Sequence, residues 1–106
     1  MQTYGKGFDA LGDPTRRGIL EQLARGPLTV GELASRVPVS RPAVSQHLRV
    51  LKDARLVHDE QSGTRRIYQI SPDGIAKMRF YLDAFWERAL EQLKTSAEHR
   101  TREGKA

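Results

Sequence analysis

The sequence contains no cysteine. Disulfide bonds, thiolate metal sites and thiol chemistry are therefore excluded, and the composition fits a reducing compartment. No apolar run approaches the roughly 18 residues that a membrane-spanning helix requires. The first residues, MQTYGKGFDALGDP, also lack the basic and then apolar layout of a signal peptide. We therefore expect a cytoplasmic protein that does not enter a membrane.

Motifs typical of enzymes are scarce. Three histidines are scattered along the chain, and there is neither a phosphate-binding glycine loop nor a nucleophile elbow. A chain of 106 residues can form one modest hydrophobic core but leaves little room for a large cofactor cleft. We therefore expect a single non-enzymatic domain without a cofactor.

The positive charge is concentrated in one part of the chain. The formal net charge is +5, and residues 36–66 alone carry a net +4, whereas residues 1–35 sum to zero and residues 73–98 carry a net −1. A basic block on a neutral body is the electrostatic footprint expected for binding a polyanion. A solvated charged surface is the alternative, and the charge distribution alone does not decide between the two.

Capping residues divide the first half of the chain into short helices. A first helix ends at Gly12, and Asp13 with Pro14 begins a second helix, which Gly26-Pro27 ends. In LTVGELASRV, Thr29 and Glu32 form a capping box for a third helix. Ser40 then caps a fourth helix, with a proline in its first turn, where the missing N–H costs nothing. Two short helices separated by about three residues predict a helix-turn-helix.

The fourth helix has two distinct faces. Val44, Leu48 and Leu51 stand at i, i+4 and i+7 and are expected to face the core. The other side carries hydrogen-bonding and basic residues together with one proline: Ser40, Arg41, Pro42, Ser45, Gln46, Arg49 and Lys52. An ordinary solvated face is the alternative, but such a face usually carries glutamate, and this one has no acid before Asp53. Since glutamine can read adenine and arginine can read guanine, we predict a DNA recognition helix over residues 40–52. His47, at the edge of the core face, is expected to be packed or hydrogen-bonded.

A hairpin is predicted directly after this helix. The segments LVHDEQ and RRIYQI have strand-forming composition and flank SGT, a short turn with glycine. Arg65 and Arg66 lie at its turn end. In isolation these arginines could equally serve solubility, but after a helix-turn-helix an arginine-rich hairpin is typical of the wing of a winged helix. We predict a basic, DNA-binding wing over residues 56–70.

These segments together resemble one family. FDALGDPTRRGILEQL, LTVGELASRVPVSRPAVSQHLRVLKDARLV and the hairpin ending RRIYQI are similar to the ArsR family of small dimeric winged-helix transcriptional repressors. The resemblance covers about residues 8–93 and implies a mainly α fold with a small β-hairpin. It implies a prokaryotic homodimer on an imperfect inverted repeat near its own promoter, released by some signal. By position it implies that Ser40, Arg41, Ser45, Gln46 and Arg49 lie in the major groove and that Arg65 or Arg66 lies on the wing.

The sequence departs from the metal-sensing members of that family. Those members place cysteines near the segment LTVGELA, where this chain has Thr29, and others use Asp and His residues of the last helix. Here Asp83, Glu87 and Glu91 stack at i, i+4 and i+8 without a nitrogen or sulfur ligand, which suits a weakly held hard cation at best. A solvated acidic face is the favoured interpretation, so we predict no metal site. The inducing signal, a small molecule or a protein if one exists, is left open.

The last helix, from about 72 to 94, carries an apolar stripe wider than one small domain needs. A purely intramolecular helix is the alternative, but adjacent aromatics on a terminal helix favour an interface. We predict a dimer interface of Phe8, Ile75, Met78, Leu82, Phe85, Trp86, Ala89 and Leu93. The expected organisation is one domain over residues 1–94 and a disordered polar tail over 95–106.

These observations favour a sequence-specific transcriptional regulator that binds double-stranded DNA as a homodimer. Two-fold symmetry would place two recognition helices about 34–36 Å apart, one turn of DNA, on a palindrome. The alternative is a winged helix that contacts only other proteins. Exposed apolar residues on the recognition face would favour that alternative, and Pro42 is the only one there.

Overall fold

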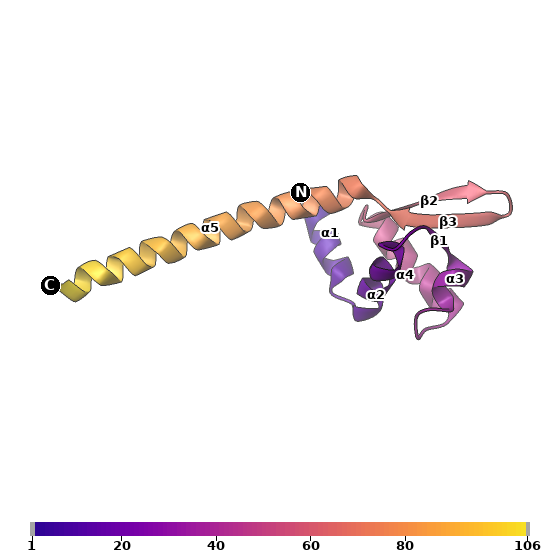
Figure 1. Ribbon diagram of the computed structural model, residues 1–106, viewed down its shortest axis with the longest axis horizontal. Coiled ribbons are helices and arrows are strands. Elements are labelled where there is room, and N and C mark those ends of the chain that lie inside the picture. Colours follow the sequence, from indigo (N-terminus) through magenta and orange to yellow (C-terminus); the bar gives the residue numbers. More distant parts are fainter. Residues whose placement is uncertain (1, 106) are drawn as a thin grey trace.

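The computed structural model describes the backbone of residues 2–105 and the side chains of residues 5–100 (Figure 1). Four helices and a small sheet form a body at one end, and a fifth, long helix projects from it, giving extents of 73 × 26 × 23 Å. In chain order the elements are α1 (Gln2–Leu11), α2 (Pro14–Leu23), β1 (Leu28–Thr29), α3 (Val30–Ala34), α4 (Arg41–Asp53), β2 (Val57–Ser62), β3 (Arg65–Ile70) and α5 (Pro72–Lys105). The predicted mainly α winged helix-turn-helix is confirmed.

The capping residues act as the sequence predicts. The Asp13 carboxylate accepts bonds from two N–H groups in the first turn of α2, at 2.7 and 3.1 Å. Thr29 and Glu32 bond each other's backbone N–H at 3.2 and 2.9 Å, which completes the capping box of α3. Ser40 Oγ accepts from the Ala43 N–H at 3.3 Å at the start of α4. Since each cap satisfies donors that a helix cannot satisfy itself, the helix starts are fixed locally.

Two arginines of α2 hold the end of α1. Arg16 Nε donates to the Ala10 carbonyl at 2.8 Å, and Arg17 Nη1 donates to the Leu11 carbonyl at 2.7 Å. Arg16 Nη1 also lies 3.4 Å from His47 Nδ1 on α4. The hydrogen-bonded role predicted for His47 is confirmed, and through Arg16 this histidine links α4 to the first two helices.

The core lies between α2, α3, α4 and the sheet. Ile19, Leu33, Leu48 and Leu56 are fully buried in it. Met78 of α5 is also buried, with only 7% of its surface exposed, so the prediction that it belongs to a dimer interface does not match its place in the core of its own chain. Phe8 is partly buried against this core, and its ring centroid lies 5.6 Å from that of Tyr81. Its place in a dimer interface stays a prediction.

The sheet has three antiparallel strands in the order β1-β3-β2. The β2–β3 hairpin is the predicted wing, and its two-residue turn follows the pairing of Ser62 with Arg65. Gly63, the first turn residue, has φ +63°, a conformation that glycine adopts without strain. The strand β1 is missing from the sequence prediction, because its two residues are held only by pairing with β3.

The junction between α4 and α5 is tight. Arg55 has φ +63° at the position after the α4 cap, where helices usually place glycine. The Leu56 N–H returns to the Leu51 carbonyl at 3.0 Å, and Ser71 N–H bonds the Leu56 carbonyl at 2.9 Å. A Cβ added to Gly74, in the first turn of α5, would overlap the Arg55 carbonyl oxygen. The start of α5 is therefore seated directly against the segment that follows α4.

The helix α5 is longer than the sequence predicted. It continues to Lys105, whereas the prediction ended it near residue 94 and assigned 95–106 to a disordered tail. The segment after Leu93 contains no proline and no glycine before Gly104, so nothing in it interrupts a helix. None of the helices in the described part of the chain is long and apolar enough to cross a membrane.

Candidate nucleic-acid interface

The outer face of α4 presents the residues that the sequence assigned to DNA. Val44, Leu48 and Leu51 are fully buried, which confirms the orientation of the helix. On the opposite side the structure exposes all seven predicted contacts: Ser40, Arg41, Pro42, Ser45, Gln46, Arg49 and Lys52. The helix therefore offers a continuous polar and basic surface without an acid before Asp53.

The wing lies beside the start of this helix. A concavity of about 400 Å³ is lined by residues at the start of α3, by Arg41 of α4 and by Thr64, Arg65 and Arg66 of the hairpin. The fold thus brings three arginines, which are up to 25 positions apart in the chain, around one space. Helix and wing form one basic surface, which the sequence could suggest only through the family resemblance.

Acidic partners hold part of this surface. Asp59 of β2 contacts Lys52 Nζ through Oδ1 at 2.8 Å and Arg66 Nε through Oδ2 at 3.2 Å. Arg65 Nη2 lies 3.9 Å from Glu32 Oε1. Within residues 5–100, Arg41 and Arg49 form no ion pair. The predicted DNA-binding cations therefore fall into two classes, three that have an acidic partner in the free protein and two that do not.

Sequence reasoning missed Asp59. Its side chain is only 6% exposed, although it lies at the border of the polar surface. A hydrogen bond from the Lys52 ammonium lowers the pKa of Asp59, an effect that burial partly opposes and that the charges of Lys52 and Arg66 reinforce. Asp59 therefore stays ionised at neutral pH. The alternation of side chains along a strand could have predicted its low exposure, because it places Asp59 on the same face of β2 as buried Val57.

Two other carboxyl groups have a lowered pKa. For Glu32 the main cause is the hydrogen bond from the Thr29 N–H, and the charges of Arg65 and Arg36 add to it. For Asp13 the main cause is the hydrogen bond from the Arg16 N–H at the start of α2. Asp13 is the N-cap of α2 and Glu32 is the N3 residue of the capping box of α3, so backbone donors at a helix start favour the charged form of each.

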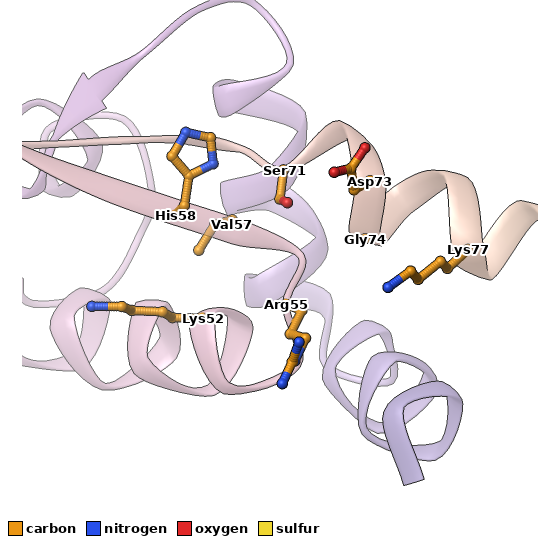
Figure 2. Close-up of a pocket in the computed structure, with 8 residues that line it drawn as sticks. All are labelled: Lys52, Arg55, Val57, His58, Ser71, Asp73, Gly74 and Lys77. Carbon is orange, nitrogen blue, oxygen red and sulfur yellow. The ribbon is translucent and has the colours of Figure 1, made fainter. Parts of the chain in front are cut away.

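A second concavity of about 400 Å³ lies where α4 ends and α5 begins (Figure 2). Lys52, Arg55, Val57, His58, Ser71, Asp73, Gly74 and Lys77 line it. In Figure 2 the side chains of His58, Asp73, Arg55 and Lys52 point in different directions. The polar side chains do not converge on one point, so they do not form an arranged binding site for a small molecule or an ion.

The helix α5 carries an exposed apolar face. Of the predicted dimer residues, six are exposed: Ile75, Leu82, Phe85, Trp86, Ala89 and Leu93. Phe85 is 52% and Trp86 62% exposed, which is unusual for large aromatic side chains. The C-terminal part of α5 extends beyond the other elements (Figure 1). Leu90, also exposed, widens the same face.

The described residues offer no obvious metal site. Within them, no three His, Asp or Glu side chains come together in a way that could hold a metal ion. Asp83, one of the stacked carboxylates of α5, lies 3.9 Å from Arg79 Nε one turn before it. These acids therefore behave as an exposed charged helix face.

Known proteins with similar sequences are transcriptional regulators. A family model described as bacterial regulatory protein, arsR family, matches residues 13–59. The HTH-type transcriptional regulator Rv2034 of Mycobacterium tuberculosis is 61% identical over 93 residues, covering 85% of this chain and 87% of that protein. The transcriptional repressor SdpR of Bacillus subtilis is 39% identical over 64 residues, covering 60% of this chain and 71% of that protein.

A solved structure extends the similarity to the fold. The solution NMR structure of a homodimeric winged helix-turn-helix DNA-binding domain from Mycobacterium bovis, described as a possible ArsR-family transcriptional regulator, superposes with a TM-score of 0.68. It shares 26% sequence identity and covers 86% of this chain and 84% of that chain.

Proposed function

Because the chain belongs to the ArsR family of bacterial regulatory proteins, we propose that it is a homodimeric repressor that binds an inverted-repeat operator in double-stranded DNA. The family itself makes it a transcriptional regulator with a DNA-binding winged helix-turn-helix, and not an enzyme. We add three proposals to what the family shows: the operator is an inverted repeat, the protein binds it as a homodimer, and binding represses transcription.

One observation carries the proposal: the exposed face of α4 is polar, basic and free of acid up to Asp53, and the arginines of the wing adjoin its start. We assign Gln46 and Arg49 to base edges, because these side chains match adenine and guanine in the major groove. Ser40, Arg41 and Ser45 in the first turns lie where phosphates approach a helix start. The concavity lined by Arg41, Arg65 and Arg66 suits a phosphate of the DNA backbone.

The exposed apolar face of α5 supports a homodimer. A surface with Leu82, Phe85, Trp86 and Leu93 exposed together is costly in water and typical of an interface. The structural neighbour from Mycobacterium bovis is homodimeric. Two chains joined through α5 would present two recognition helices to two half-sites, about 34–36 Å apart.

Repression is supported by SdpR, a relative that is a transcriptional repressor. A protein that occupies a promoter excludes polymerase without further chemistry, so no cofactor is required.

The test is a fluorescence-anisotropy titration of the protein against its own upstream DNA and a scrambled control at several salt concentrations. We expect at least about a thousandfold preference for the upstream DNA, and a steep loss of affinity with salt, near −0.9 in log–log slope for each phosphate contacted. Weak and equal binding to both DNAs would contradict the proposal. The α4 face would then be tested as a protein-binding surface.

A further inference from the structure

Asp59 is the least exposed charged group at the DNA-facing surface, and it joins the two elements that form this surface. Its side chain is 6% exposed, whereas the Lys52 and Arg66 side chains are 54% and 50% exposed. Each carboxylate oxygen contacts a different element, Oδ1 the last turn of α4 and Oδ2 the strand β3. Both cations thus keep about half of their surface available while one end is held.

The sheet register explains how the three side chains meet. Asp59 pairs with Tyr68, so Arg66 is its diagonal neighbour two residues along β3, within reach of a long side chain. Asp59 shares its strand face with Val57, which is 2% exposed and faces the core. The carboxylate therefore points toward α4, and the Lys52 ammonium reaches it from there.

We propose that Asp59 is a positioning residue for DNA binding, which sets Lys52 and Arg66 in the arrangement that contacts the phosphates and fixes the wing relative to the recognition helix. The proposal rests on the proposed function, since it assumes that these two cations face DNA. Free lysine and arginine side chains lose much rotational freedom when a phosphate immobilises them. In this protein, the ion pairs with Asp59 impose part of that order before DNA arrives, which reduces the cost of binding.

This role predicts an effect opposite to that of simple electrostatics. A carboxylate close to DNA repels phosphate, so its neutralisation alone should strengthen binding to any DNA. If Asp59 positions the two cations, its neutralisation weakens binding to the operator instead. The sign of the change therefore separates positioning from bulk charge.

Glu60 provides a matched control. It is the next residue on β2, it is exposed, and its side chain points to the other face of the strand. Asp59→Asn and Glu60→Gln remove the same charge at neighbouring positions. We expect Asp59→Asn to weaken operator binding about tenfold, and Glu60→Gln to leave operator binding unchanged or slightly tighter.

A double-mutant cycle distinguishes positioning from a general loss of structure. In a Lys52→Gln, Arg66→Gln background, Asp59→Asn should cause no further loss of operator affinity, because its two partners are already gone. An equal tenfold loss in that background, or an operator affinity that rises in Asp59→Asn as in Glu60→Gln, overturns the proposal. Thermal melting of each variant shows whether it is folded at the assay temperature.

A measurement on the unaltered protein covers the case in which Asp59→Asn does not fold. In the free protein, NMR should show slower exchange with water for the Arg66 Nε proton than for that of Arg49, which is exposed and forms no ion pair within residues 5–100. Equal exchange rates would contradict the proposal. Failure of the wild-type protein to distinguish operator from scrambled DNA would instead remove the proposed function.

Discussion

Gly74 lies so close to the backbone of Arg55 that a Cβ on Gly74 would overlap the Arg55 carbonyl oxygen. The first turn of α5 is thereby seated on the residue that follows the C-cap of α4. We predict that Gly74→Ala lowers the free energy of unfolding by at least about 1–3 kcal/mol, because backbone atoms must move to admit the methyl group. Urea denaturation followed by circular dichroism measures this change.

Gly18 is the control for that substitution. It lies inside α2, and nothing lies within 4 Å of a Cβ built on it. Gly18→Ala should therefore raise the free energy of unfolding by about 0.5–1 kcal/mol, since alanine restricts the unfolded chain and favours helix. If Gly74→Ala stabilised the protein as Gly18→Ala does, the close packing at the junction would be wrong.

The second prediction concerns base recognition. Gln46→Ala should weaken operator binding by about 1–3 kcal/mol and leave scrambled DNA unaffected, because a bidentate contact to a base edge exists only at the cognate sequence. Arg65→Ala should weaken binding to both DNAs and flatten the salt dependence, as expected when a phosphate contact is lost. Anisotropy titrations of both variants measure these effects, and equal losses on both DNAs for Gln46→Ala would exclude Gln46 as a base reader.

The third prediction tests the apolar face of α5. Phe85→Asn should shift the protein from dimer to monomer and, through loss of paired half-site binding, weaken operator affinity. Phe80 is the matched control, because it is more exposed, at 73%, yet lies about 140° around the helix from Phe85. Analytical ultracentrifugation should show that Phe80→Asn remains dimeric. A dimeric Phe85→Asn would remove Phe85 from the interface.

The fourth prediction concerns acid stability. The hydrogen bond from Lys52 lowers the pKa of Asp59 in the folded protein below its ordinary value of 3.8. A carboxyl group with a lowered folded pKa stabilises the protein above its unfolded pKa, and this contribution is lost as the pH falls through the folded pKa. We therefore expect the melting temperature of the wild type to fall more steeply below about pH 5 than that of Asp59→Asn. Parallel curves for the two proteins would contradict this expectation.

Much of the fold is readable from the sequence because its signals are local. Asp13, Thr29 and Ser40 cap helices through bonds to residues two or three positions away, and the turn glycine of the wing acts within the hairpin. The buried positions of α4 follow from helical spacing alone. These interactions involve only residues close together in the sequence, so the local sequence pattern is sufficient to predict them.

The missed features depend on distant partners. The strand β1 has two residues and is held only by its pairing with β3. The ion pairs of Asp59 require both the hairpin register and the distance between the sheet and α4, which no local pattern contains. Met78 and Leu82 are four residues apart and lie on the same face of α5. Met78 is buried and Leu82 is exposed because the body of the protein covers only the start of this helix.

The projecting half of α5 has a consequence for backbone dynamics. Every side chain from Phe85 to Arg100 is exposed, so this segment gains no packing energy from the body. An isolated helix of that length is marginal in water, and its amide protons should exchange rapidly unless a second chain lies against it. Protection from exchange in this segment should therefore rise with protein concentration, while the protection of α4 in the core does not.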